Sequence, residues 1–184
     1  MKVMKRVLIA TVLTVFALLP ATHAYAATAA ELDGKVAETI EVFKNEVNGA
    51  DVFLGQSVGY LVFPRVIKVG IGIGAETGEG ALVVNGRSAA YFRTTSGSFG
   101  LQLGAQAKSM VIAFMTKESL AKFRESSGWQ IGVDGSVALI DVGAGKQINT
   151  GNIKDPVVGF IFGSKGLMYN LTLEGTKISR VKKD

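Results

Sequence analysis

The sequence has no cysteine, one histidine and three prolines among its 184 residues. The lack of cysteine excludes disulfide bonds, thiolate catalysis, cysteine zinc sites and attachment of lipid through a lipobox cysteine. The one histidine, His23, lies within the first 26 residues, which we expect to be removed. The remaining chain then has no imidazole to serve as a general base, a metal ligand or a member of a catalytic triad.

The first 26 residues are predicted to be a secretory signal peptide. Three basic residues among the first six precede an uninterrupted apolar run at 7–20, and Ala24 and Ala26 then give a small-residue cleavage pattern. The apolar run is shorter than the roughly 20 residues of a membrane-spanning helix. We therefore expect cleavage near Ala26 and a periplasmic or secreted protein. A retained membrane anchor is the alternative.

Removal of this segment changes the balance of charge. The sequence has 20 basic and 15 acidic residues, and three basic residues lie before residue 27, so the remainder carries 17 minus 15, or +2. This charge does not indicate nucleic-acid binding, and none is predicted. Residues 27–51 hold six acidic and two basic side chains, a charge of −4, which leaves +6 on the rest. The sequence thus predicts a mildly basic body beneath an acidic helix.

Helical spacing of apolar residues marks two segments. A capping box at residues 28–31, a period of three to four residues and a following Asn-Gly pair predict a helix over Ala29–Val47. Its apolar face is expected to pack on the body, because a helix lying on a membrane usually has Lys and Arg on its polar face. Thr116 is expected to cap a second, shorter helix over Lys117–Ser126.

From Gly55 onward the apolar period changes to two, which predicts strands, and Asn85-Gly86 predicts a type I′ hairpin turn. Glycine alternates with larger residues in VGIGIGA, SFGLQLGAQ and VVGFIFG. Because glycine weakens a strand, its repetition indicates strong curvature and close packing. We predict a mainly β (α+β) fold: one compact, mostly antiparallel, curled or barrel-like domain, with the N-terminal helix packed on it. The predicted core comprises Val36, Ile40, Phe43, Val62, Ile71, Val83, Leu103, Val111, Phe123, Val137, Phe160 and Leu171.

Two other architectural features follow from the same patterns. The segment Gly143–Asp155, in which glycine and polar residues cluster, is predicted to be the softest part of the chain. An outer-membrane barrel is the alternative fold. It is disfavoured because most strand-like runs are shorter than the ~9–11 residues that spanning strands need, and because a charged helix interrupts them.

Patterns that would indicate an enzyme are incomplete. Gly70–Ala75 fits the dinucleotide-binding G-x-G-x-x-A pattern, but further glycines and a strand follow it where a helix is needed. Glu76 and Glu79 flank these glycines and are interpreted as solvated charges. Asp134 and Asp141 are expected on opposite faces of a strand-like run. A catalytic carboxylate pair stays open, but nothing favours one. The residues therefore predict a binding or structural module, not an enzyme.

Four stretches of the sequence resemble the SYLF domain family, which includes proteins of actin patches and phosphoinositide-rich membranes and secreted bacterial members. They are GYLVFPRVIKVGIGIGAETGEGALVVNG, SFGLQLGAQAKSMVIAFMTKESLAKF, GWQIGVDGSVALIDVGA and GFIFGSKGLMYNLTLEGTKI. The similarity runs from Val36 to Ile178. It implies that residues 27–184 form a non-enzymatic domain that binds acidic lipid without a cofactor or metal. Anionic phospholipid is the expected ligand here, and the actin binding of some yeast members is not expected in a bacterial envelope.

Basic residues near the glycine-rich strands form the predicted lipid-binding site. Arg65 and Lys68 follow the bend at Pro64, Arg87 follows the hairpin turn, and Arg93 lies beyond the next strand. Cations at these positions are expected to meet phosphate head groups while apolar neighbours reach the acyl boundary. The alternative function is an envelope scaffold that binds protein and no lipid, in which these residues are ordinary solvated charges.

Overall fold

The computed structural model describes residues 27–142, 154–166, 173 and 175–184, with the backbone alone at 99–103, 141 and 166. The predicted signal peptide lies outside the described residues. So does most of the predicted soft segment.

Both predicted helices are confirmed. Helix α2 spans Ala29–Glu46 and begins with the predicted capping box: Thr28 Oγ1 accepts from the Glu31 N–H, and the Glu31 carboxylate accepts from the Thr28 N–H. Helix α4 spans Lys117–Glu125, and the Thr116 side chain caps it. A third helix, α3 at Ala50–Gln56, was not predicted. It starts at the Asn-Gly pair that ends α2.

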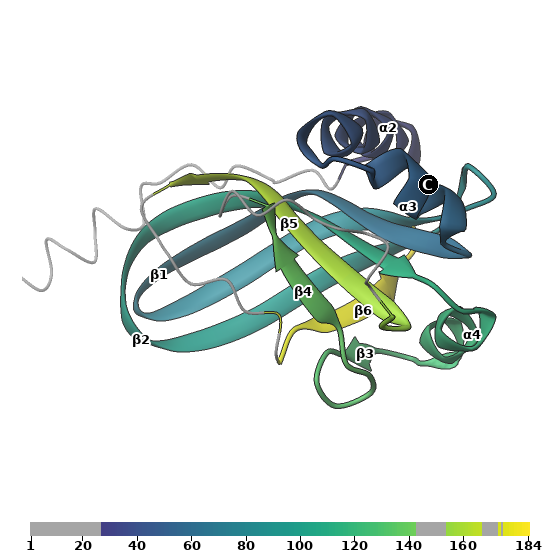
Figure 1. The fold of residues 1–184 in the computed structure, drawn as a ribbon. Helices are drawn as coiled ribbons and strands as arrows, with labels where there is room; N and C mark the ends of the chain where they lie inside the picture. Colours follow the sequence, from purple (N-terminus) through teal and green to yellow (C-terminus); the bar gives the residue numbers. More distant parts are fainter. Residues whose placement is uncertain (1–26, 143–153, 167–172, 174) are drawn as a thin grey trace, which may run out of the picture.

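Two long strands, β1 (Gly59–Val84) and β2 (Arg87–Phe114), form a curled antiparallel hairpin (Figure 1). The predicted tight turn joins them, with positive φ angles of 52° at Asn85 and 72° at Gly86. The glycine-alternating run SFGLQLGAQ lies within the continuous β2. Both long strands bend near their middles, so the hairpin folds back on itself and its bend lies at the opposite end of the molecule from the Asn-Gly turn (Figure 1).

The other edge of β2 pairs with two shorter strands, β5 (Val157–Gly166) and β6 (Lys177–Val181), and β3 (Trp129–Gln130) extends the sheet from β6. Strand β4 (Ala138–Asp141) runs parallel to β5, so the mostly antiparallel sheet is mixed. The predicted mainly β fold with a curled sheet is confirmed.

The sheet has apolar clusters on both faces. The inner cluster fills the concave side and is closed by α4; it includes Leu61, Phe63, Met110, Phe114, Phe123 and Trp129. The outer cluster lies beneath α2 and α3; it includes Val36, Phe43, Phe53, Val62, Val111 and Phe160. Seven of the predicted core residues are buried, and Ile40 and Val137 are half-buried. The side chains of Leu103 and Leu171 lie outside the description, and Ile71 was wrongly placed in the core.

Glycine serves two purposes in β1. Gly72, with φ of 71°, lies where the strand bends sharply. Farther along, β1 returns over its own beginning, and a Cβ built on Gly80 would lie 2.1 Å from the carbonyl oxygen of Val62. Only a hydrogen atom fits there. The dinucleotide-like pattern at 70–75 is therefore a bend within a strand, and no helix follows it.

Candidate functional site

The outer face of β1 is covered by α2 only along part of its length. At Val62 this face is buried in the outer cluster. Nearer the bend, the same face exposes a row of β-branched side chains: Ile67 (38%), Val69 (49%), Ile71 (80%) and Ile73 (65%). We call these four residues the outer ridge. An exposed apolar row of this kind marks an interaction surface more often than an isolated apolar residue does.

Cations lie beside the outer ridge. Ile67 pairs with Ala107 of β2, and Ala107 pairs with Lys165 of β5, so the three residues form one row across the sheet. Directly paired residues share a face, which places Lys165 on the face of the ridge. Its side chain is exposed. Lys165 was not among the predicted site residues.

A hollow of about 280 Å³ separates α2 from the start of the ridge. The residues that line it are Lys35, Glu38, Thr39 and Val42 of α2, Pro64 and Arg65 of β1, and Ser109 of β2. The hydroxyl groups of Thr39 and Ser109 donate to the carbonyl oxygens of Lys35 and Pro64 at 2.7 and 2.9 Å. Arg65 is exposed, as predicted, and lies two residues before the ridge.

The structure corrects the expected position of Lys68. Its side chain is only 4% exposed and faces the inside of the hairpin, where its strand partner is Gln106. Residues three apart in a strand point to opposite faces, so Arg65 and Lys68 cannot meet one surface together. Lys68 therefore does not adjoin Arg65 on the outer face.

The two remaining predicted site residues lie elsewhere. Arg87 is exposed beside the Asn-Gly turn, which is at the other end of the hairpin from the bend. Arg93 is half-exposed, and its guanidinium contacts the Glu79 carboxylate at 2.7 Å. The structure thus brings none of Lys68, Arg87 and Arg93 to the outer ridge.

The interpretation of Glu76 and Glu79 as solvated charges is wrong. Glu79 accepts from Arg93 and from Lys183 of the C-terminal tail, and Lys183 also donates to the carbonyl of Ala27 at 2.7 Å. Burial opposes ionisation of Glu79, but the hydrogen bonds from Lys183 and Arg93 outweigh it and hold the pKa of the carboxyl below its ordinary value.

Glu76 belongs to a polar group inside the bend. Its carboxylate forms a buried ion pair with Lys108 at 3.0 Å, in which both side chains are less than 5% exposed. Glu76 Oε1, Gln106 Oε1 and Thr94 Oγ1 are also buried and have no hydrogen-bond partner among the described residues. At this end of the hairpin, polar groups face inward and apolar groups face outward.

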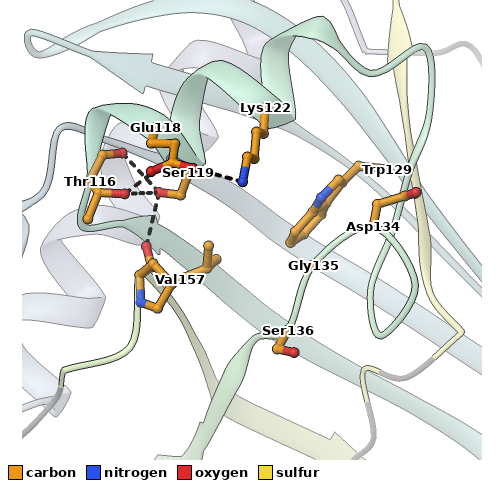
Figure 2. Close-up of a pocket in the computed structure, with 10 residues that line it drawn as sticks. Thr116, Glu118, Ser119, Lys122, Trp129, Asp134, Gly135, Ser136 and Val157 are labelled. Atoms are coloured by element: carbon orange, nitrogen blue, oxygen red, sulfur yellow. Dashed lines mark hydrogen bonds and ion pairs between the residues drawn. The ribbon is translucent and has the colours of Figure 1, made fainter.

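A second pocket, of about 210 Å³, lies beside α4 (Figure 2). Its floor includes Trp129 and Val157, and Glu118, Lys122 and Asp134 lie around it. The charged groups of this pocket and the hydroxyls of Thr116 and Ser119 are already engaged in other contacts. Glu118 pairs with Lys122 at 2.8 Å, the Asp134 carboxylate accepts from the Gln130 N–H at 2.6 Å, and the Ser119 hydroxyl lies within hydrogen-bonding distance of two carbonyl oxygens and the Thr116 hydroxyl. No nucleophile contacts a base among the residues that line the pocket.

Within the described ranges, no group of three or more His, Cys, Asp and Glu residues is placed to hold a metal ion. Across the same part of the chain, no helix combines the length and the apolar character that a bilayer-crossing helix requires.

Comparison with protein families gives a match over residues 95–184. These residues match the family model Ysc84, which is described as Las17-binding protein actin regulator. The Ysc84 family is the SYLF domain family. The predicted resemblance is thereby confirmed over these residues, and SYLF domains are a family of binding domains. A comparison with curated proteins finds no significant match to the chain. The match begins in the middle of β2 and extends through β3 to β6.

Proposed function

We propose, with the SYLF domain at residues 95–184 as the premise, that this protein is a binding module that docks on membranes containing anionic phospholipid. The outer ridge carries this proposal. Its four side chains continue a sheet face that α2 buries elsewhere, yet they remain in water. Transfer of such side chains to the acyl boundary of a membrane is favourable by roughly 25 cal/mol for each Å² of apolar surface removed from water.

The charges around the ridge favour an anionic surface over a neutral one. Arg65 precedes the ridge and Lys165 lies in the same cross-strand row as Ile67. Each cation held near an anionic membrane contributes about 1 kcal/mol, and salt screens this contribution. A protein docked by its ridge holds Arg87, at the opposite end of the hairpin, away from the bilayer.

The cellular location is part of the same proposal. The predicted signal peptide supports a periplasmic or secreted protein, and an envelope membrane is then the surface within reach. The family description names an actin regulator, but we do not extend that role to this chain, because the proposed periplasmic or secreted location separates it from actin.

Vesicle flotation tests the proposal. The chain from residue 27 is mixed with phosphatidylcholine vesicles, with and without phosphatidylglycerol, and we expect it to float only with the anionic vesicles and less as salt rises. The double variant Ile71→Ser/Ile73→Ser should weaken binding by about 2 kcal/mol, or about thirtyfold, because part of two large side chains no longer enters the membrane. Arg65→Gln/Lys165→Gln should have a similar effect at low salt.

The matched control is Val133→Ser, which removes another highly exposed β-branched side chain, in the turn after β3, far from the ridge. This variant should bind anionic vesicles like the wild type. The proposal fails if the wild-type protein ignores anionic vesicles at low salt. It also fails if the ridge variant and Val133→Ser bind equally well.

A second candidate function is binding of an envelope protein, and the pocket beside α4 favours it. This pocket has an apolar floor and a charged margin, and it lies at the end of the molecule opposite the bend (Figures 1 and 2). Crosslinking from a probe at Ser136, on the margin of the pocket, would recover a partner if this function is correct. A scaffold without lipid binding would show that partner and no flotation.

A further inference from the structure

The hollow between α2 and β1 combines two cations that the rest of the protein leaves unused. Lys35 reaches it from α2 and Arg65 from β1. Neither the ammonium of Lys35 nor the guanidinium of Arg65 forms an ion pair or hydrogen bond with any described residue. The other cation of α2, Lys44, is paired with Glu41 at 2.7 Å.

The composition of the hollow suits a phosphate group. With Glu38 also present, the three charged side chains give a net charge of +1. A guanidinium offers a planar pair of N–H donors that matches two phosphate oxygens, and an ammonium adds a compact positive charge. The hydroxyl groups of Thr39 and Ser109 donate to backbone carbonyl groups, so the two cations are the principal free donors.

The position of the hollow identifies the source of that phosphate. It lies at the point where α2 stops covering the sheet, and Arg65 is two residues from the first side chain of the ridge. A ridge in the acyl boundary places the hollow at the level of the head groups, because phosphates lie immediately outside the acyl region. Lys35 therefore reaches the same layer although α2 as a whole is acidic.

We infer that this hollow binds the phosphodiester of one anionic phospholipid, with Arg65 and Lys35 as its ligands. The inference rests on the proposed function, because it names the lipid group that the docked protein holds. It distinguishes a specific head-group site from docking by diffuse charge alone.

The inference can be tested without a membrane. The protein is titrated with soluble glycerophosphoglycerol, and binding is monitored by the NMR signals of its amide and guanidinium groups. We expect shifts at Arg65, Thr39 and Ser109. Arg65→Gln and Lys35→Gln should each weaken binding about fivefold, since one exposed charge contact contributes up to about 1 kcal/mol. Glu38→Gln should strengthen binding by a similar factor, because it removes the competing carboxylate. Lys44→Gln, on the same helix but outside the hollow, should bind like the wild type.

Inorganic phosphate is the second probe. If it binds as tightly as the diester and competes with it, the hollow is a site for free phosphate and the lipid assignment is overturned. If Arg65→Gln and Lys35→Gln bind glycerophosphoglycerol like Lys44→Gln, the hollow is not the site.

The ridge variant separates this inference from the proposed function. Ile71→Ser/Ile73→Ser should lose vesicle binding and keep glycerophosphoglycerol binding, since neither side chain lines the hollow. If the wild type floats with anionic vesicles but does not bind the soluble head group, the inference fails and the proposed function stands. If the wild-type protein binds the soluble head group but does not float with anionic vesicles, both the membrane docking and the lipid assignment fail.

Discussion

The start of β1 and the bend near its middle distribute apolar side chains in opposite ways. Near its start the strand is apolar on both faces: Leu61 and Phe63 enter the inner cluster, and Val62 enters the outer cluster under α2. Near the bend the inner face carries Lys68, buried among other polar groups, and the outer face exposes Ile71 and its neighbours. The covered end follows the ordinary arrangement of a packed sheet, and the bend reverses it.

This difference separates residues that stabilise the fold from residues that are available for binding. At the covered end each apolar side chain is already in contact with others, so its contribution is to folding. At the bend the outer ridge contributes little to folding in water, and its burial awaits a membrane or another partner. Substitutions at the start of β1 and at its bend should therefore affect different measurements.

The largest expected effect is in the outer cluster, to which the start of β1 and Phe160 of β5 both contribute. Phe160 is fully buried, and its ring centroid lies 5.0 Å from those of both Phe43 and Phe53. Phe160→Ala should lower the free energy of unfolding by about 3–5 kcal/mol, because it leaves a cavity beside the rings of Phe43 and Phe53. Ile71→Ala should change it by no more than about 0.5 kcal/mol. Denaturant unfolding of both variants tests the comparison, and equal destabilisation would contradict it.

The buried ion pair inside the bend should have the next largest effect. Lys108→Met leaves the Glu76 carboxylate buried without its partner, and we expect a loss of about 3 kcal/mol in the free energy of unfolding. The double variant Lys108→Met/Glu76→Gln removes the unpaired charge as well and should recover most of that loss. If the double variant is no more stable than the single one, the pair does not behave as a coupled buried unit.

Gly80, where β1 passes over its own beginning, comes third. Ala at this position would place its Cβ against the Val62 carbonyl, so the strand must shift, at a cost of about 1–3 kcal/mol. Gly97→Ala is the matched control in β2, because nothing lies within 4 Å of its Cβ position. Thermal unfolding should separate the two variants clearly. A stability equal to that of Gly97→Ala would show that the strand has room at Gly80.

Local patterns were sufficient to predict the elements whose signals lie within a few residues. The capping box and helical period predicted α2, and Asn85-Gly86 predicted the hairpin turn. The glycine runs predicted strong curvature, but the sequence pattern did not show that the bend falls within a single continuous strand at Gly72. Helix α3 was missed since its seven residues are too few to establish a period.

The binding surface was predicted less completely. Alternation tells which residues of β1 share a face, but not where α2 stops covering that face, and Ile71 was assigned to the core for this reason. The odd spacing of Arg65 and Lys68 could have shown that they point apart. The partners of Glu76 and Glu79 were beyond prediction, because Lys108 and Lys183 are 32 and 104 residues away in the sequence.

The smallest effect concerns Glu79, which joins β1 to Arg93 of β2 and to Lys183 of the tail. Because its pKa is lowered in the folded protein, the ion pairs stabilise the fold at pH values above the unfolded pKa of about 4.3, and this stability is lost as the pH falls through the folded pKa. Glu79→Gln should therefore lower the free energy of unfolding by about 1 kcal/mol at neutral pH. The difference from the wild type should shrink as the pH falls and disappear once the wild-type carboxyl is protonated. Glu118→Gln, which breaks a fully exposed pair on α4, should show a smaller change. If urea unfolding gives Glu79→Gln and the wild type parallel losses of stability in acid, Glu79 does not join the tail to the hairpin.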